Sequence, residues 1–570
     1  MSVPTLKSSE IYKSPQDRTR LQSLQDTFAA RFSAPPTFTV RSPGRVNIIG
    51  EHLDYSNFSV FPMAVERDVV MAVRVIPPGP SVVNGGGVVI VANTDSTTFP
   101  ESSITLPQST QTLVDIDPTR NDWANYFRCG LIVAQKYLQG SYNSELPELD
   151  HPNNHQQPPK QLAGLEVLVD GNIPTGSGLS SSAAFVVCST LVTLLANGYN
   201  NVSKNLMVRL SMKCEQLVGV NTGGMDQAAS VYGEWDHALY VSFFPQLTAK
   251  ATAFPEPPAL ANGLPDDENK MAFVIAHTLV TSNKHETAPI NYNLRVVEVT
   301  LAALALAKAL GLSAPNSIIS ATTSSSSSSS DIDGHPLLVD LVLPPTGNLA
   351  AGTLRDVFEL YKTTRPSSVS DSDLLQELVT LVDTHLRDDY TFSDLATLLS
   401  TSSDTEIVNA QLTRLFFSTY PVRYSALQLR KRARHVYSEA ARVFKFMNVL
   451  RFSTMQYLET VAELGRLMDA SEVSLWEDFE CSCPEAQALC KVVRKPRGPH
   501  GSEPLGYGAR MTGAGWGGAT VHLVLQKNVA AVVQAFKDEY YRVKYPGISE
   551  KEMNEAIIIS RPAVGTAIVE

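Results

Sequence analysis

The stretch at residues 172–185, NIPTGSGLSSSAAF, places a glycine- and serine-rich turn between two segments of different periodicity. Before it, residues 165–170 (LEVLVD) alternate as a strand does. After it, apolar residues at positions 184, 187, 188, 191, 194 and 195 follow the i, i+3, i+4 spacing of a helix that buries one face. The order along the chain is therefore strand, glycine-rich turn and helix.

A helix that begins at such a turn can bind an anion, because its first N–H groups are unpaired and carry partial positive charge. Glycines let the backbone approach a phosphate closely, and serine hydroxyls can donate to phosphate or ligate Mg²⁺. No lysine follows the second glycine, so the stretch is not a G-x-x-x-x-G-K-[ST] loop. An ordinary helix start after a flexible turn fits this stretch equally well, and a second motif is needed to decide.

Composition limits the class of protein. The 570 residues are 43% hydrophobic and 18% charged, which is typical of a globular chain with two or more domains. The net charge of −11 argues against nucleic acid as the main partner. The basic cluster at residues 430–434 lies in a predicted helix and is interpreted as a solvated helix face.

Targeting signals and disulfides are not expected. No apolar run reaches the roughly 18–20 residues that cross a bilayer, and the polar N-terminus lacks the apolar core of a signal peptide. Six cysteines in 570 residues are too sparse for a disulfide framework. We therefore predict a cytoplasmic protein with reduced thiols and no membrane partner.

The chain divides into a strand-rich first part, a helical middle and a final part that returns to strands. Prolines at positions 245, 255, 257 and 258 interrupt the pattern, so we predict domains at residues 1–255 and 256–570. Seven consecutive serines mark residues 321–334 as a low-complexity insertion. The expected elements are helices at 17–32, 293–312, 437–450 and 532–541, and strands at 38–40, 69–76, 165–170, 519–525 and 556–560.

A second motif, PGRVNIIGEHLDYSNFSVFPMAV at residues 43–65, concentrates polar side chains between apolar strands. Within ten residues it contains Arg45, Glu51, His52 and Asp54. Buried polar groups cost stability unless they have partners, and the hydroxyls of a sugar would supply such partners. Any one of these residues alone could simply face solvent.

Together these residues resemble the galactokinase signature of the GHMP kinase superfamily, whose members phosphorylate small metabolites. The glycine-serine stretch is similar to the phosphate loop of that superfamily, and RMTGAGWGG at residues 510–518 resembles its C-terminal glycine-rich motif. Four further stretches resemble fungal galactokinases: GGMDQAAS (223–230), NYNLRVVEVT (291–300), ECSCPEAQALC (480–490) and EYYRVKYP (539–546).

The resemblance implies an α+β two-domain GHMP kinase fold, in which an N-terminal mixed-sheet domain and a C-terminal α+β domain enclose the active site. It implies ATP-dependent phosphorylation of the C1 hydroxyl of galactose, the first committed step of galactose catabolism. It also implies that Asp226 is the catalytic carboxylate and that Arg45 holds it ionised. A cation makes a carboxylate a weaker base, which a loose transition state tolerates. Whether Asp226 removes the proton or only orients the hydroxyl stays open.

The resemblance further assigns binding residues. Those implied for galactose are Arg45, Glu51, His52, Asp54, Gly223, Asp226 and Tyr292. Those implied for ATP are Gly176, Ser177, Gly178, Leu179, Ser180, Ser181, Ser182 and Trp123. The Mg²⁺ ligands implied are Ser182 and Glu215. Trp123 is equally consistent with a plain core residue.

Two other functions remain open at this point. Fungal galactokinases have non-catalytic relatives that bind galactose and ATP and release a transcriptional repressor, but those lack two residues of the serine loop that is complete here. N-acetylgalactosamine kinase is the second alternative, since no single residue indicates the space beside the C2 substituent. The resemblance implies a monomer.

Overall fold

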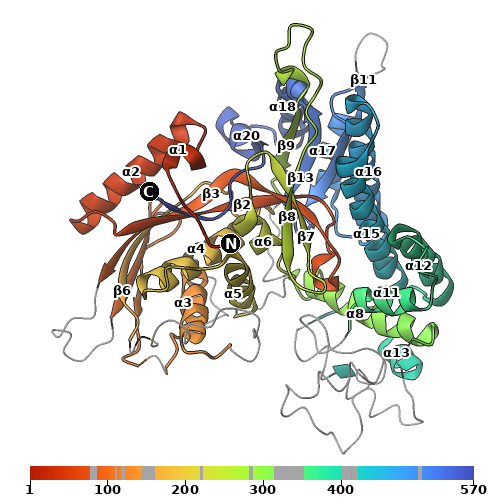
Figure 1. Cartoon of the computed structure of the whole chain (residues 1–570), viewed down its shortest axis with the longest axis horizontal. Helices are drawn as coiled ribbons and strands as arrows, with labels where there is room; N and C mark the ends of the chain where they lie inside the picture. The colour runs from red at the N-terminus through yellow and green to blue at the C-terminus, as the bar shows by residue number, and fades with distance from the viewer. Residues whose placement is uncertain are drawn as a thin grey trace, which may run out of the picture.

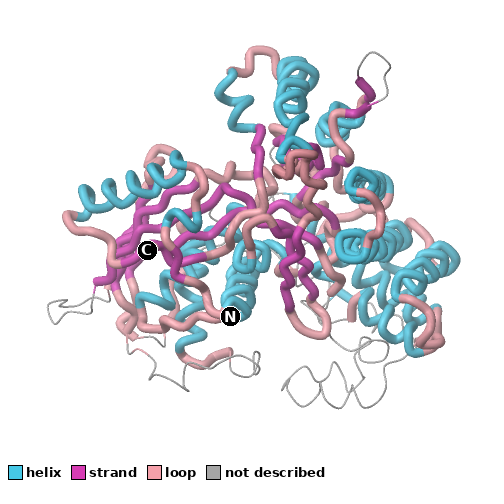
Figure 2. Tube along the Cα trace, turned by 45° about the horizontal axis from the view of Figure 1, so that its top comes forward, coloured by secondary structure: helices cyan, strands magenta, loops and turns pink. Residues whose placement is uncertain are grey.

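A computed structural model describes residues 1–76, 87–109, 112–116, 122–142, 159, 161–217, 223–280, 287–312, 352–399, 412–413, 422–497 and 503–570. The strands form two main sheets, one in each half of the chain, with helices packed around them (Figures 1 and 2). One continuous apolar core includes buried residues of both halves, so the two sheets share packing as well as polar contacts.

The first sheet has seven strands in the order β1-β15-β2-β3-β6-β4-β5. Their bounds are β1 (Thr5–Leu6), β15 (Ala567–Val569), β2 (Phe38–Ile49), β3 (Phe61–Ile76), β6 (Gly164–Gly171), β4 (Val88–Asn93) and β5 (Ser102–Thr105). The strand β15 enters this sheet from the far end of the sequence and lies between β1 and β2. The antiparallel pairing of β2 with β3 shifts register twice, between Pro43 and Arg45 and between Asn47 and Ile49. Such irregularities redirect side chains, and they fall on the predicted sugar motif.

Helices cover both faces of this sheet. The helix α2 (Pro15–Phe32) lies on one face against β3 and β6, while α4 (Ser181–Ala196) packs on β2 and β3 from the other (Figure 1). The remaining helices of this half are α1 (Ser8–Ile11), α3 (Asn125–Leu138), α5 (Lys204–Leu217) and α6 (Met225–Tyr232). A two-stranded ribbon of β7 (His237–Ser242) and β8 (Thr248–Ala253) follows.

The second sheet is antiparallel, with strand order β12-β13-β9-β14. Its strands are β12 (Gly508–Thr512), β13 (Ala519–Leu525), β9 (Met271–His277) and β14 (Ile557–Ser560). The helices of this half are α8 (Tyr292–Ala309), α11 (Leu354–Thr363), α12 (Asp371–His385), α13 (Phe392–Leu399), α15 (Leu429–Phe452), α16 (Tyr457–Glu477), α17 (Pro484–Arg494), α18 (Val529–Phe536), α19 (Arg542–Lys544) and α20 (Glu550–Ala556). The short ribbon of β10 (Pro496–Arg497) and β11 (Glu503–Pro504) and a π-helical turn at Lys537–Tyr541 also lie in this half. Short 3-10 helices at Asp54–Ser56, Asp267–Asn269 and Gln526–Asn528 complete the described elements.

The predicted α+β fold with a mixed sheet is confirmed, and the predicted helices and strands are all present. Some bounds were too short, since β2 continues to Ile49 and α15 begins at Leu429. The predicted insertion at residues 321–334 lies outside the described residues. All six cysteines are free, in agreement with the predicted reduced thiols, and all six are buried.

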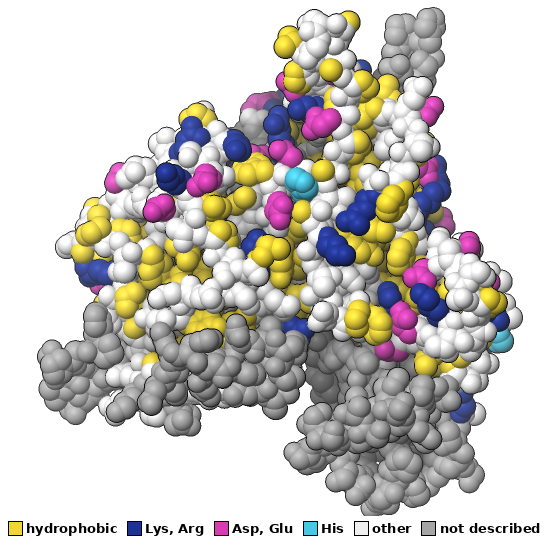
Figure 3. Space-filling view, viewed as in Figure 1, with side chains coloured by type: hydrophobic (Ala, Val, Ile, Leu, Met, Phe, Trp, Pro, Cys, Tyr) yellow, Lys and Arg dark blue, Asp and Glu magenta, His cyan; other side chains and the backbone are white. Residues whose placement is uncertain are grey.

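The interpretation of residues 430–434 as a solvated helix face was wrong for one residue. The side chain of Arg432 is only 2% exposed, and its Nε lies 2.8 Å from Glu298 on α8. Its Nη2 lies 2.8 Å from Glu480, so the guanidinium is stabilised by two carboxylates. Among the described residues on the face in Figure 3, basic and acidic side chains lie intermixed rather than as one basic area. None of the described helices is long and apolar enough to span a bilayer.

Candidate functional site

The two halves of the chain meet at a small polar pocket. Its lining residues are Arg45, Glu51, His52, Asp54, Met225, Asp226, Tyr292, Gly513 and Ala514. Six of the seven residues predicted to bind the sugar are therefore brought together, from β2, the loop that follows it, α6 and α8. The seventh, Gly223, is not part of the lining and packs against Asp54, which is. Four of the lining side chains, those of Arg45, Glu51, His52 and Asp54, are at most 7% exposed, which agrees with groups that need a bound partner.

At one end of the pocket, Arg45 and Asp226 form an ion pair. The Arg45 Nε donates to Asp226 Oδ1 over 2.7 Å, and its Nη2 lies 2.6 Å from the same oxygen. The other oxygen, Oδ2, accepts from the Ser180 hydroxyl. Burial by itself would lower the pKa of Arg45, but the carboxylate of Asp226 raises it above its ordinary value. Asp226 is thus a carboxylate that accepts hydrogen bonds at both oxygens and is held in a fixed orientation.

Asp54 lies beside Asp226 and is backed by Gly223. A Cβ at Gly223 would lie 2.4 Å from the backbone carbon of Asp54 and 2.5 Å from its carboxyl carbon, so only glycine permits this approach. The Met225 amide donates to Asp54 Oδ2 over 3.4 Å. Burial raises the pKa of Asp54 to about 6, and the neighbouring charge of Asp226 adds to the rise.

His52 is fixed as a neutral ring. Its Nε2 donates to the Ala514 carbonyl over 3.1 Å, because a carbonyl oxygen can only accept. Its Nδ1 therefore accepts from the Tyr55 hydroxyl, 2.9 Å away. Burial lowers the pKa of His52 well below its ordinary value. The ring lies against Tyr292, with centroids 5.7 Å apart, and forms an aromatic wall of the pocket.

The predicted phosphate loop leads from β6 into α4 beside this pocket. Gly176, Gly178 and Ser180 all have positive φ, at 69°, 77° and 57°. The Arg45 Nη1 donates to the Gly178 carbonyl over 2.6 Å, so the same arginine touches both the loop and Asp226. The Ser177 hydroxyl is turned back onto the Pro174 carbonyl, 2.6 Å away. Leu179 is buried, and its carbonyl accepts from the Arg45 amide over 3.1 Å.

The glycine-rich turn after β12 packs against this loop. A Cβ at Gly513 would lie 2.6 Å from the Gly178 carbonyl oxygen. A Cβ at Gly178 would in turn lie 3.1 Å from the Thr512 carbonyl oxygen. Both turns thus need glycine at their contact, and this is where the C-terminal half approaches the phosphate loop.

Ser182 and Glu215 also meet, although they are far apart in sequence. The Ser182 hydroxyl donates to Glu215 Oε1 over 3.2 Å, and the Gln227 amide donates to Oε2 over 2.9 Å. A hydroxyl and a carboxylate are the oxygen donors that Mg²⁺ prefers, so the pair fits that ion. Within the described residues, no group of three or more His, Cys, Asp or Glu side chains could form a complete cage. Phosphate oxygens and water would have to complete the coordination shell.

Trp123 lies outside the lining of the pocket. It precedes α3, and its Nε1 donates to the Pro100 carbonyl over 2.9 Å. Its ring meets the edge of Phe185, in the first turns of α4, with centroids 5.9 Å apart. Trp123 is therefore adjacent to the helix that the phosphate loop begins, without lining the pocket itself.

Several site residues were not predicted from the sequence. Met225, Ala514, Tyr55 and Gln227 contact the predicted residues or line the pocket. Each lies within one of the quoted motifs, so proximity in the sequence was the available signal. The tautomer of His52 had no such signal, because the Ala514 carbonyl that sets it is some 460 residues away along the chain.

Comparisons with known proteins agree on the family. The galactokinase galactose-binding signature matches residues 26–75, the GHMP kinase N-terminal domain matches residues 149–234, and the GHMP kinase C-terminal domain matches residues 454–542. The galactokinase of Saccharomyces cerevisiae is 39% identical over 560 residues, which cover 96% of this chain and 94% of the relative. The galactokinase of Schizosaccharomyces pombe is 36% identical, covering 100% of this chain and 99% of the relative.

A solved structure is similar in fold. The crystal structure of Lactococcus lactis galactokinase complexed with galactose aligns with a TM-score of 0.58 at 22% sequence identity. The alignment covers 96% of this chain and 99% of that one. The whole described architecture therefore has a counterpart in one known fold.

Proposed function

Because this chain belongs to the galactokinase family of the GHMP kinase superfamily, we propose that it transfers the terminal phosphoryl group of ATP to the C1 hydroxyl of galactose. The observation that carries the proposal is the Arg45–Asp226–Ser180 contact. It joins the phosphate loop directly to the polar pocket, so a phosphate donor and a hydroxyl acceptor bound at these two places would meet at Asp226.

In the proposed reaction, the C1 oxygen of the sugar attacks the terminal phosphorus as the bond to the bridging oxygen of ADP breaks. The hydroxyl proton passes to Asp226 during the transfer, or it passes by way of Asp226 to solvent after the transfer. The ion pair with Arg45 makes this carboxylate a weak base. A loose transition state releases the proton late, so orientation and charge contribute more than base strength. Arg45, which touches Asp226 and the phosphate loop at once, offsets the charge that moves between them.

The sugar would be held by the other residues that line the pocket. We assign Asp54 to a pair of adjacent hydroxyls, C3 and C4, because a carboxylate can accept two hydrogen bonds. Glu51 and Tyr292 line the same space and complete the polar contacts, while His52 supplies an apolar surface. A site built to pair a hydroxyl can reject an epimer strongly, on the order of 10⁴-fold in favourable cases.

ATP would lie along the loop from Gly176 to Ser182, with its phosphates at the start of α4. Ser182 and Glu215 are the residues that would hold Mg²⁺, which when bound neutralises phosphate charge. We place the adenine near Trp123, since that residue packs beside the first turns of α4. We further propose that the protein is a monomer with one domain at residues 1–255 and a second at residues 256–570.

The test is the release of ADP by the purified chain with Mg-ATP and, separately, galactose, N-acetylgalactosamine and glucose. Turnover on galactose that is lost in Asp226→Ala is the expected result. Binding of galactose and ATP without ADP release would instead indicate the sensor function, and comparable turnover on N-acetylgalactosamine would widen the substrate class. Absence of both binding and turnover would refute the proposal.

A further inference from the structure

The loop that carries Glu51, His52 and Asp54 is held from behind by the C-terminal half. The Gly50 amide donates to Glu439 Oε1 on α15 over 2.9 Å. The His435 Nε2, also on α15, donates to the Glu51 carbonyl over 3.1 Å. These two contacts hold the backbone of the loop, while the Glu51 side chain has partners of its own, among them a backbone group of Gly513.

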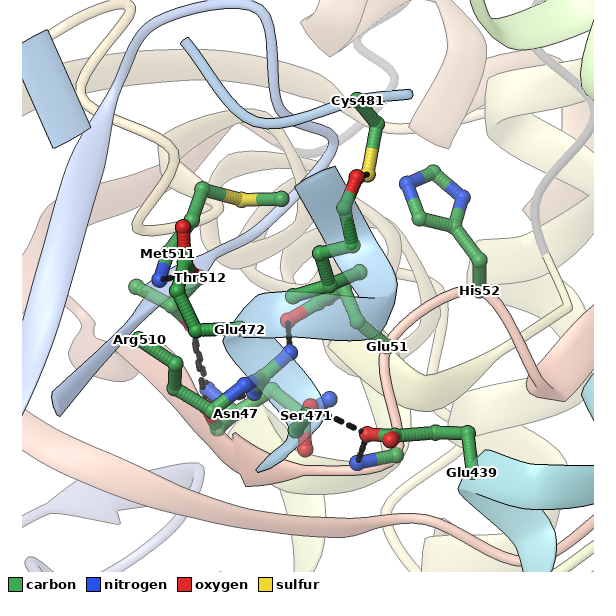
Figure 4. Close-up of polar contacts among 12 residues, drawn as sticks. Asn47, Glu51, His52, Glu439, Ser471, Glu472, Cys481, Arg510, Met511 and Thr512 are labelled. Atoms are coloured by element: carbon green, nitrogen blue, oxygen red, sulfur yellow. Dashed lines mark hydrogen bonds and ion pairs between the residues drawn. The ribbon is translucent and has the colours of Figure 1, made fainter. Parts of the chain in front are cut away.

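The Glu51 side chain is fixed by Arg510 on β12 (Figure 4). This guanidinium is fully buried, and its Nη2 lies 3.1 Å from Glu51 Oε2. Its Nη1 donates to the Asn47 carbonyl over 2.9 Å, on the strand that leads into the loop. The Thr512 hydroxyl accepts from the backbone N–H of Asn47 over 2.9 Å. Side chains of β12 therefore bond both the N–H and the carbonyl of Asn47 on β2. Arg510 therefore bridges the strand β2 and the Glu51 carboxylate, which lines the pocket.

We propose that Arg510 is a positioning residue that keeps the Glu51 carboxylate ionised and aimed at the sugar, a role that rests on the proposed function. A guanidinium has several donors in one plane, so it can bond the Asn47 carbonyl and the Glu51 carboxylate at the same time, whereas a lysine is a single point charge. Without Arg510, the buried carboxylate of Glu51 loses its closest counter-charge from the C-terminal half. The Glu51 carboxylate then takes up a proton or rotates away from the pocket, and an acceptor for a sugar hydroxyl is lost.

The charges around Glu51 give this role a pH signature. The charged groups facing its carboxyl are Arg510 on β12, Arg45 on β2 and Asp226 on α6. Two neutral titratable groups lie nearby, the His435 ring on α15, which bonds the Glu51 backbone, and the thiol of Cys481. Burial raises the pKa of Glu51 to about 7, while Arg510 and Arg45 oppose that rise. Removing Arg510 would raise the pKa of Glu51 further, so the group would be protonated at neutral pH.

The experiment compares Arg510→Gln and Arg510→Lys in the full chain, using the ADP assay from pH 6 to 9. We expect Arg510→Gln to raise the KM for galactose about 10- to 100-fold and the KM for ATP less than about twofold. The acid limb of kcat/KM for galactose should move upward by about one pH unit or more. Arg510→Lys should keep that limb in place because it keeps the charge.

Arg41→Gln is the matched control. Arg41 is equally buried, at 1% exposure, and pairs with Asp68 at 2.7 Å, outside the pocket lining. It should lower thermal stability without changing the galactose KM relative to the ATP KM. If Arg510→Gln does not fold, Glu51→Gln decides the question. It should raise only the galactose KM and move the acid limb of kcat/KM for galactose down from about pH 7 to about pH 6, where Asp54 titrates.

Two pH profiles would overturn the inference: an acid limb of kcat/KM that stays in place in Arg510→Gln, or an acid limb that stays near pH 7 in Glu51→Gln. An ATP KM that rises as much as the galactose KM would also refute it, by indicating a general structural role. Failure of the wild-type chain to turn over galactose would instead refute the proposed function, so the two failures are distinguishable.

Discussion

Replacing Asp54 by asparagine should increase the stability of the protein and lower its affinity for the sugar. Asp54 is buried beside Asp226, and the pKa of its carboxyl rises from the ordinary 3.8 to about 6. Because the folded state holds this proton more tightly than the unfolded state, ionising Asp54 costs stability. The cost is absent below pH 3.8, grows between pH 3.8 and 6, and is constant above pH 6.

The size of the effect follows from the same two values. A rise of about 2 pH units corresponds to about 3 kcal/mol of lost stability at pH 7.5. At pH 5, where the carboxyl is mostly protonated in the folded state, the loss is about 1.6 kcal/mol. An asparagine at this position carries no charge at either pH, and its amide oxygen can still accept from the Met225 amide. Asp54→Asn should therefore gain about twice as much stability at pH 7.5 as at pH 5.

Urea unfolding of both proteins at the two pH values measures this gain. In parallel, the galactose KM of Asp54→Asn should rise at least about tenfold, since an amide cannot accept two hydrogen bonds at two equivalent oxygens. A gain that is the same at pH 5 and pH 7.5 would refute the electrostatic reasoning. A variant less stable than the wild type at pH 7.5 would show that the hydrogen bonds of Asp54 outweigh its desolvation.

Three further substitutions test the rest of the site. Asp226→Asn should lower kcat about 10²- to 10⁴-fold, while the galactose affinity measured by calorimetry should change little. If the variant keeps a tenth of the wild-type kcat, a proton-accepting role of Asp226 is excluded. Gly513→Ala, whose Cβ would lie 2.6 Å from the Gly178 oxygen at a φ of +89°, should raise the ATP KM and cost about 1–3 kcal/mol of unfolding free energy. Its control is Gly547→Ala, where φ is +95° but no atom lies within 4 Å, so the ATP KM should not change. Glu215→Gln should raise the Mg²⁺ concentration needed for half-maximal activity about tenfold in a Mg²⁺ titration, and an unchanged requirement would contradict the assignment.

Strongly periodic segments could be predicted from the sequence alone. The strand β6 appears within a residue of its expected bounds, and α4 begins at the serines and contains the apolar stripe of residues 184–195, because alternation and the helical stripe are local properties. The basic residues 430–434 were also expected to lie in a helix, but the burial of Arg432 was missed. Arg432 is buried there only because Glu298 on α8 and Glu480 reach it, and such long-range pairing leaves no periodic trace.

The same distinction applies to the site. Arg45, Asp54 and Asp226 belong to local motifs, so the family resemblance located them. Glu439 and His435 lie on α15, whose apolar spacing is typical of an ordinary core helix. Nothing in the positions of these two residues in the sequence indicates a contact with Gly50 or Glu51. Residues that orient other residues act through tertiary contacts, which the sequence does not display.

The position of β15 sets an order of events during synthesis. Ala567 pairs with Arg41, 526 residues earlier (567 − 41), which at about 5–20 residues per second is a delay of roughly 25–100 s. Throughout that interval the outer edge of β2 has no neighbour, and the Arg41 guanidinium lacks the Val564 and Gly565 carbonyls that accept from it. An uncovered strand edge is a template for pairing with other chains. A ribosome stalled just short of β15 would therefore hold a chain that contains every lining residue of the pocket and still exposes the strand that carries Arg45.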